Sequence, residues 1–140
     1  MPRPRLRLFA LCPLVLGGCT IPPPPAGTQY DGTYSGQDSL VSGVDFQCGA
    51  PILQERLEVR DGHFDYPFQV SPPRVAPLPV QVATNGVMSG QMQYGTGDEI
   101  RQFSRDSVDW VYLRGGITGT TMDATISNIH CVRRLIAWRS

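Results

Sequence analysis

The chain has 140 residues, of which 41% are hydrophobic and 17% charged, and twelve arginines balance twelve Asp and Glu residues to a formal net charge of zero, with no lysine. This length favours one domain with a single hydrophobic core. The arginines form no clustered basic patch. Because phosphate binding needs concentrated positive charge, the composition argues against a nucleic-acid partner.

The amino terminus has the pattern of an export signal. Three arginines fall within the first seven residues, and an apolar run follows over residues 8–18. That run is about half as long as the roughly 20 residues that a membrane-spanning helix needs. A basic segment, a short apolar segment and small residues before a cleavage site are typical of a secretory signal peptide. We therefore predict a signal peptide over residues 1–18.

Leu16, Gly17, Gly18 and Cys19 end this run with the tetrad LGGC. The tetrad resembles the lipobox of bacterial lipoproteins, in which the cysteine thiol is acylated and becomes the first mature residue. The resemblance implies that Cys19 is the lipid anchor, with more acyl chains than the single chain that binds membranes only marginally. Thr20, where an aspartate would retain such a protein at the inner membrane, implies an outer-membrane lipoprotein facing the periplasm or the surface. The alternative is an ordinary secretory signal cleaved a little further on.

Residues 19–29 contain four consecutive prolines. Such a run favours an extended polyproline II spacer of about 3.1 Å per residue. We predict a lipidated cysteine with a proline-rich tether over 19–29 and a single domain over 30–140. Removal of the signal leaves nine arginines against twelve carboxylates, a net charge of about −3. The alternative interpretation of the prolines is a ligand for a partner's groove.

Two cysteines remain in the exported domain, Cys48 and Cys131, because Cys12 leaves with the signal. An even pair in an oxidising compartment predicts a disulfide. Closing a loop of roughly 80 residues should stabilise the fold by about 3–4 kcal/mol in the chain-entropy model. A metal site is the alternative, but isolated cysteines with two histidines in the whole chain make poor zinc ligands. We predict no metal and no cofactor.

The exported part alternates apolar and polar residues between closely spaced turn signals, which is typical of an all-β fold. Asp61-Gly62 and Asn85-Gly86 are strong two-residue hairpin signals. Pro67, inside an otherwise regular strand, indicates an edge or a bulge, because it has no N–H. About eight strands are expected, over residues 30–41, 52–60, 63–70, 78–84, 87–95, 108–116, 120–128 and 130–139. A stiff proline-rich connection is expected over 71–77.

Eight strands joined by hairpins form an antiparallel meander, and closure into a small up-and-down barrel would remove both free edges. The last strand would then pair with the first, with residues 131–138 beside 32–39. Gly36, Gly90 and Gly119, single glycines expected inside strands, fit the tight bends of a small barrel. A β-sandwich is the alternative.

The segments DGTYSG, VRDGHF, NGVMSG and GTTMDATIS, with one cysteine in the last strand, resemble small exported β-proteins of alphaproteobacteria. The similarity covers most of residues 30–139 and implies an architecture but no activity. The first strand is also similar to the opening of avidin-like and lipocalin-like barrels. The chain has no recognisable set of biotin-binding residues, so that resemblance implies the barrel alone.

No catalytic motif occurs: H-E-x-x-H, G-x-S-x-G, the P-loop and G-x-G-x-x-G are all absent. His63 follows a hairpin signal and is interpreted as a solvated turn residue. His130 is interpreted as a strand-end residue. Serines and aspartates are numerous, but no spacing singles out a nucleophile with its base. We therefore predict that the protein is not an enzyme.

The longest polar insertion, residues 95–107, is a possible binding loop, because loops on rigid scaffolds often carry binding function. Its candidate residues are Asp98, Glu99, Arg101, Phe103 and Arg105. Asp98 is also a suitable cap for one helical turn. The alternative is a salt-bridged lid without a ligand.

Together these features favour a binding or structural module of the cell envelope, held at the membrane through its lipid anchor. The ligand would be an apolar small molecule in the barrel mouth, or an envelope protein or peptidoglycan on the loops. An envelope-protease inhibitor is a variant of this hypothesis. A wide open barrel would favour the small molecule, and a barrel filled with side chains would point to the outer surface. If the loop is not the site, the strand faces around Trp110 and Trp138 are the next candidates.

Overall fold

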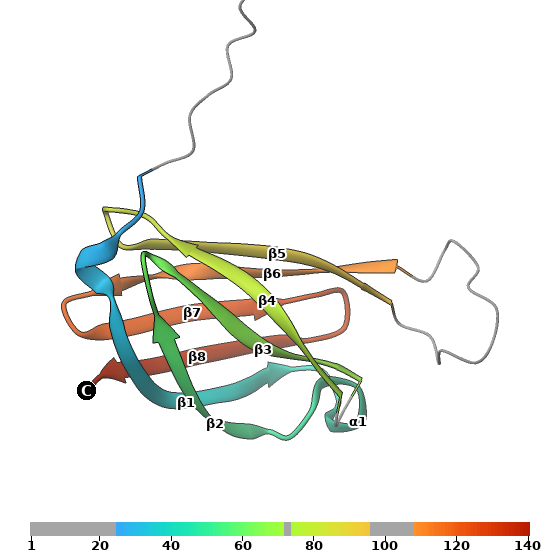
Figure 1. The fold of residues 1–140 in the computed structure, drawn as a ribbon. Helices are drawn as coiled ribbons and strands as arrows, with labels where there is room; N and C mark the ends of the chain where they lie inside the picture. The colour runs from blue at the N-terminus through green and yellow to red at the C-terminus, as the bar shows by residue number, and fades with distance from the viewer. Residues whose placement is uncertain (1–24, 72–73, 96–107) are drawn as a thin grey trace, which may run out of the picture.

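The computed structural model describes residues 25–71, 74–95 and 108–140. Over these ranges the chain forms eight strands and two short helical segments (Figure 1). The strands are β1 (Gly32–Ser42), β2 (Ile52–Val59), β3 (His63–Ser71), β4 (Arg74–Val82), β5 (Val87–Gly95), β6 (Val108–Thr118), β7 (Thr121–Ser127) and β8 (Val132–Arg139). The helical segments are the 3-10 turn η1 (Thr28–Tyr30) and the single turn α1 (Asp45–Cys48). The predicted all-β class is confirmed.

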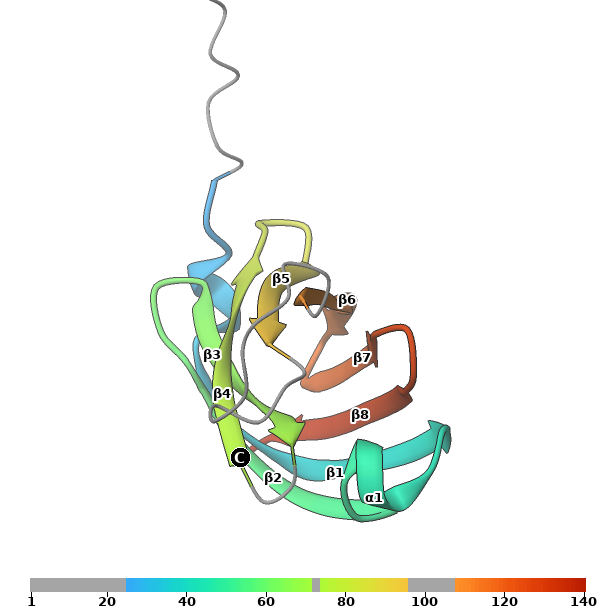
Figure 2. The ribbon, with the colours of Figure 1, turned by 90° about the vertical axis from the view of Figure 1, so that its right-hand side faces the viewer.

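The strands form one antiparallel sheet in the order β2-β1-β8-β7-β6-β5-β4-β3. The first strand pairs with the last, from Tyr34 opposite Arg139 to Leu40 opposite Arg133. Figure 2 shows this sheet curled around one interior. The predicted meander barrel is confirmed, including the pairing of its first and last strands. The strands do not form the two packed sheets of a β-sandwich.

The barrel is open at one junction, between β2 and β3. In the described residues these strands are joined by a single bridge, in which Arg60 and His63 exchange two backbone hydrogen bonds of 2.9 Å. The predicted turn does form, with φ of 52° at Asp61 and 69° at Gly62. The strands then diverge, as Figure 1 shows. The expectation that closure removes both free edges is therefore wrong at this junction.

Two features of the facing edges explain the separation of β2 from β3. The bridge at the turn sets a register in which Glu58 would lie opposite Asp65, and Arg56 opposite Pro67. Two carboxylates directly opposite one another destabilise a strand pair. Pro67 has no N–H to donate across the junction. As predicted for that proline, it lies on an edge strand, because β3 ends the sheet.

The strands β4 and β5 also separate over much of their length. They pair through three residues of each strand, Val80 to Val82 with Gly90 to Met88. Pro77 and Pro79 lie on β4 just beyond this short ladder, and neither has an N–H for a central strand pairing. The β3–β4 hairpin is therefore bonded to its neighbours near one end and diverges from both of them at the other.

Side chains from every strand fill the barrel interior. Those with no more than 1% of their surface exposed include Tyr34, Tyr66, Leu78, Val82, Met88, Val111, Leu113, Met122, Ile126, Leu135 and Ala137. The predicted alternation holds on β6, where Val111 and Leu113 face inward while Trp110 remains 40% exposed. The barrel thus has a packed core of the kind expected for a small eight-stranded barrel.

Two glycines allow neighbouring strands to approach closely. A Cβ at Gly36 would lie 2.0 Å from the carbonyl oxygen of Ile136, and one at Gly90 would lie 2.6 Å from that of Pro79. Gly119, expected inside a strand, lies instead in the turn between β6 and β7, with φ of 59°. A positive φ of this size favours glycine, which has no Cβ.

The domain's contacts begin earlier than the predicted boundary at residue 30. Ala26 bridges to Ala83, and the Gly27 N–H donates to the Val82 carbonyl at 2.7 Å, so the last residues assigned to the tether pack on the barrel. The expected connection over 71–77 is also shorter than predicted, because β4 begins at Arg74. Among the described residues, no helix has the length and hydropathy to cross a membrane.

Candidate functional site

The barrel has two ends, which we call the α1 pole and the turn pole. The α1 pole carries α1 and the turn at 128–131. The turn pole carries the turns at 61–62 and 85–86 together with η1. At the α1 pole a disulfide joins Cys48 to Cys131, with an S–S distance of 2.03 Å. It ties α1 to the chain entering β8 and confirms the predicted pairing.

The other predicted site residues are not part of the described structure. Cys19, the expected lipid anchor, lies outside the described residues. The same holds for the candidate loop residues Asp98, Glu99, Arg101, Phe103 and Arg105. The candidate site must therefore be sought among the side chains of the barrel itself.

A buried charged cluster lies inside the barrel near the α1 pole. Asp38 is fully buried and Arg133 is 4% exposed. Arg133 Nε donates to Asp38 Oδ1 at 2.8 Å, and the rest of the guanidinium donates to the carbonyl oxygens of Cys48, Ala50 and Asp38. The Tyr66 hydroxyl donates to the second carboxylate oxygen of Asp38. Each buried charge thus has both an opposite charge and further hydrogen bonds, the condition under which an ion pair is tolerated in a core.

Glu55, on the inner face of β2, gives this cluster an excess of negative charge. Burial, and then the nearby Asp38 carboxylate, raise the pKa of Glu55 to about 7, while Arg133 opposes the change. Burial and the same carboxylate also raise the pKa of Tyr66. Glu55 therefore exchanges its proton near neutral pH.

The space beside this cluster is too small for an organic ligand. A cavity of about 10 Å³ lies there, lined by Tyr66, Phe68, Gln69, Cys131 and Arg133 among others. Such a volume holds about one water molecule. The buried Oε1 of Gln69 has no hydrogen-bond partner in the structure. The Asp38–Arg133 pair is consequently part of the barrel's framework, and the cavity beside it has no room for a substrate.

The sequence carried a signal for this cluster that our prediction overlooked. Charged residues occur in the inward phase of three strands. Asp38 follows Tyr34 at an even spacing, Glu55 lies between Leu53 and Leu57, and Arg133 precedes Leu135 by two. Successive side chains of a strand point to opposite faces, so a charged residue in register with apolar ones points into the core. A charge buried there needs a partner of opposite charge, which predicts a buried ion pair.

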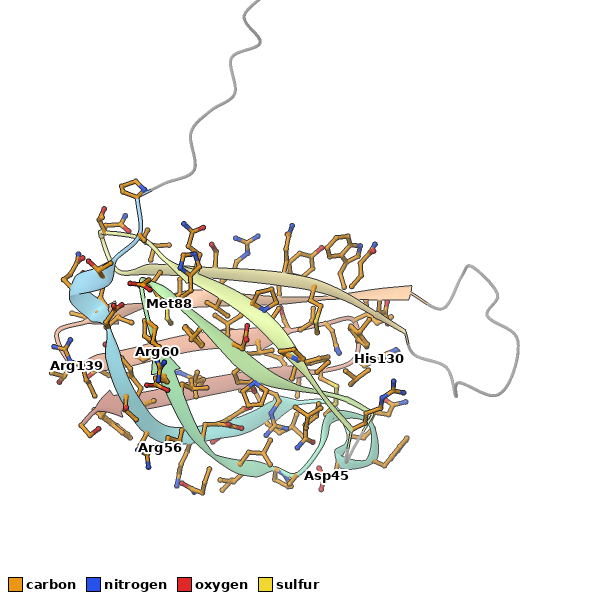
Figure 3. The ribbon with its side chains drawn as sticks, in the orientation of Figure 1. Asp45, Arg56, Arg60, Met88, His130 and Arg139 are labelled. Carbon is orange, nitrogen blue, oxygen red and sulfur yellow. A yellow bond between two sulfur atoms is a disulfide. The ribbon has the colours of Figure 1, made fainter. Side chains whose placement is uncertain are left out.

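A large concave surface lies on the outside of the barrel, across β2 to β6. This outer groove has a volume of about 850 Å³. Its polar lining comprises Glu58, Arg60, His63, Asp65, Gln81, Ser89, Gln91 and Arg114. The groove lies where β4 begins to separate from β5, and Gly90 is among its lining residues. Figure 3 shows Arg60 at the turn-pole end of this surface.

The charges in the outer groove are exposed and loosely held. Arg60 pairs with Glu58 at 2.6 Å, with both side chains more than half exposed. Arg114 lies 6.0 Å from the ring centre of Tyr112. His63 is exposed, with Nδ1 2.8 Å from the Asp61 carbonyl oxygen. It is the first residue of β3, which agrees with its interpretation as a solvated residue next to a turn.

The remaining candidates lie outside this groove. Trp110 stacks on Tyr112 on the outer face of β6, with ring centres 6.2 Å apart. Trp138 is 54% exposed on β8, opposite Ser35 and Thr121. His130 lies in the turn before β8, 3.9 Å from Asp109, as expected of a strand-end residue. Trp110 lies near the α1-pole end of β6 and Trp138 near the turn-pole end of β8, and β7 runs between the two strands. The two tryptophans therefore do not form one site.

Comparisons with family models, curated proteins and solved structures gave no match to this chain. In the described part of the chain, no group of three or more His, Cys, Asp or Glu side chains is placed to hold a metal ion. The functional argument accordingly rests on the geometry of the barrel and on the export pattern of the sequence.

Proposed function

We propose that this chain is a lipid-anchored binding module of the cell envelope, in which the barrel is a rigid scaffold and the outer groove holds the partner. The observation that carries this proposal is the contrast between the two concave spaces. The interior cavity is about 10 Å³, whereas the outer groove is about 850 Å³. Ligand sites are concave and usually several hundred Å³ in volume.

The export pattern supports the envelope location. The LGGC tetrad favours lipidation of Cys19. The Cys48–Cys131 disulfide is compatible with an oxidising compartment. The tether joins the barrel at the turn pole, because Ala26 bridges to Ala83 there. On this proposal the α1 pole is directed away from the membrane.

Binding is favoured over catalysis by where the unusual ionisable group lies. Glu55 has a pKa raised to about 7, and the cavity beside the cluster it faces holds about one water. The outer groove instead carries exposed charges of both signs with several amide and hydroxyl side chains. Such a lining suits recognition of a polar partner. A filled interior gives no support to an apolar ligand in the barrel mouth.

The test is capture of partners from detergent-solubilised envelope by the full lipidated chain. Arg114→Glu reverses a charge in the outer groove. Arg134→Glu is the matched control, because Arg134 is exposed on β8, away from the groove, where it pairs with Asp123. We expect Arg114→Glu to lose the partner and Arg134→Glu to keep it. Equal capture by both variants would contradict the assignment of the groove.

The anchor is tested by membrane fractionation. Cys19→Ser removes the thiol that would carry the lipid, so this variant should leave the membrane fraction or remain unprocessed. Membrane attachment equal to that of the wild type, with palmitate still incorporated, would contradict the lipobox interpretation.

A further inference from the structure

The strand β2 presents a free backbone edge at the open junction. On its other side the ladder with β1 includes a bond from the Leu40 N–H to the Pro51 carbonyl at 2.7 Å. Hydrogen bonding alternates along an antiparallel strand, so the N–H and C=O groups of Gln54, Arg56 and Glu58 turn toward the junction with β3. In the described part of the chain, the Arg60–His63 bridge beside the turn is the one hydrogen-bonded strand pair between β2 and β3.

The junction widens with distance from the turn. Val59 and Leu57 are closest to the turn, and they are 1% and 2% exposed. Glu55 and Leu53 continue the same inner face and are half-buried. The inner side chains of β2 therefore become accessible from the junction toward the α1 pole, where Figure 1 shows β2 and β3 apart.

Glu55 places a negative charge at this opening. Asp38 and Arg133 satisfy one another in a buried pair at 2.8 Å. No ion pair among the described residues includes Glu55. On the outer side, Asp65 adds a carboxylate near the turn. The outer face of this edge also carries Arg56 and Arg60, and Arg60 pairs with Glu58. The inner face at Glu55, when ionised, is therefore the part of the junction that is complementary to a positive side chain.

We propose that an extended peptide carrying a basic residue binds by adding a strand to β2, with the basic side chain on the inner face beside Glu55. This inference rests on the proposed function as a binding module and names the class of its partner. Rows of unpaired N–H and C=O groups at a strand edge are templates for such pairing. Strand addition draws affinity from main-chain hydrogen bonds and specificity from alternate side chains.

The structure supplies a substitution that removes one edge donor and spares the barrel's own ladder. The Arg56 N–H faces the junction, because Arg56 is out of phase with the residues of β2 that bond β1. Arg56→Pro deletes that donor at an edge position, where proline is tolerated. Arg56→Ala is the matched control, since it removes the same side chain and keeps the N–H.

The probe is the fluorescent peptide Thr-Val-Thr-Arg-Thr-Val-Thr, added to the full chain in detergent micelles at pH 8 and followed by anisotropy. We expect Arg56→Pro to weaken binding about tenfold, the effect of losing one backbone hydrogen bond. Arg56→Ala should bind like the wild type. Glu55→Gln should weaken this peptide but not its analogue with valine in place of arginine. Equal affinity of the Pro and Ala variants would overturn the proposal.

Amide hydrogen exchange keeps the proposal testable if Arg56→Pro fails to fold. In the wild type the peptide should slow exchange at Gln54 and Arg56, because their N–H groups gain acceptors. Unchanged exchange at saturating peptide would overturn strand addition. A dimer that Arg56→Pro converts to monomer, with no peptide bound, would assign the edge to a second copy of the chain and also overturn the proposal.

Capture of the envelope partner by the two variants distinguishes failure of strand addition from failure of the proposed function. Capture that is lost with Arg114→Glu and kept with Arg56→Pro would leave the binding module standing and refute strand addition. Capture that is lost with Arg56→Pro and kept with Arg114→Glu would support the β2 edge and refute the groove. Capture that survives both variants would refute both.

Discussion

Two junctions of this barrel differ in a way that their order along the chain does not predict: β1 and β8 pair along their length, whereas β2 and β3 do not. β1 and β8 are the first and last strands, yet they pair from Tyr34–Arg139 to Ser42–Val132. β2 and β3 are adjacent along the chain and joined by a favourable two-residue turn, yet a single bridge connects them. Separation along the chain does not decide which junction closes.

The chemistry of the facing edges accounts for the difference. At β1–β8, Gly36 admits close approach of the strands, and Asp38 of β1 meets Arg133 of β8 with opposite charge. At β2–β3, continuing the register that the turn sets would place Glu58 opposite a like charge at Asp65. A turn starts a hairpin, but cross-strand pairs determine whether it continues.

The largest expected effect comes from breaking the closed junction at its charged cluster. Arg133→Met leaves Asp38 buried without its cation, so we expect a loss of about 3–5 kcal/mol in the free energy of unfolding. Urea denaturation followed by tryptophan fluorescence measures it. Arg134→Met is the control: its side chain lies on the outer surface, paired with Asp123, and its loss should change the same quantity far less, because a surface ion pair contributes little to stability. Equal losses in the two variants would contradict the role of the cluster.

The disulfide lies at the α1 pole, near the charged cluster, and links α1 covalently to the residue that precedes β8. Replacing both Cys48 and Cys131 with Ala should cost up to about 4.5 kcal/mol, since the unfolded chain regains the entropy of an 83-residue loop. Thermal melting with and without a reductant checks this. The reductant should lower the melting temperature of the wild type and not that of the double variant. A wild type that melts identically in both conditions would count against the disulfide.

The pH dependence of stability probes the edge of β2. The pKa of Glu55 is about 7 in the folded chain and 4.5 as the ordinary value. Between these values the unfolded chain has lost the proton that the folded chain keeps, so the free energy of unfolding falls as pH rises from about 4.5 to 7. Below about 4.5 both states are protonated and this contribution is constant.

Glu55→Gln should remove this fall in the free energy of unfolding between about pH 4.5 and 7, because glutamine does not titrate. At pH 8 the variant should be more stable than the wild type by about 1–2 kcal/mol, a figure reduced for solvent screening at a half-buried site. At pH 4 the two should be equally stable. Urea titrations at pH 4, 6 and 8 provide the measurement. A difference between variant and wild type that is the same at all three pH values would show that Glu55 does not titrate in this range.

Much of the architecture follows from the sequence because strands leave periodic traces. The alternation expected for these segments agrees with the burial of Phe64 and Tyr66 on β3 and of Leu113 on β6. The disulfide followed from the count of cysteines in an exported domain. Both inferences need only local patterns and the compartment, not the arrangement of distant strands.

The features that escaped prediction depend on contacts between distant segments. α1 has no side-chain cap, and Arg133 donates to the carbonyl of its last residue, Cys48, so tertiary contacts help to hold that single turn. The outer groove needs five strands to be placed side by side before its lining residues meet. The separation of β2 from β3 could be foreseen only by setting Glu58 opposite Asp65, which requires the register.

The smallest expected effect on stability comes from closing the open junction. Asp65→Arg with Pro67→Val places a positive charge opposite Glu58 across the junction and restores the missing N–H donor opposite Arg56. The new cross-strand pair gains about 0.2–1 kcal/mol, and the loss of proline costs a similar amount through the unfolded chain, so the free energy of unfolding should change by less than about 1 kcal/mol. Amide exchange is the informative readout: the N–H of Arg56 and the new N–H at position 67 should become protected, and the basic peptide should no longer bind. The single variant Pro67→Val, which keeps the repulsion between Glu58 and Asp65, is the control and should show weaker protection. If neither variant gains protection, the packing of Phe64, Tyr66 and Phe68 against the core holds β3 away from β2, and the edge residues are not the cause.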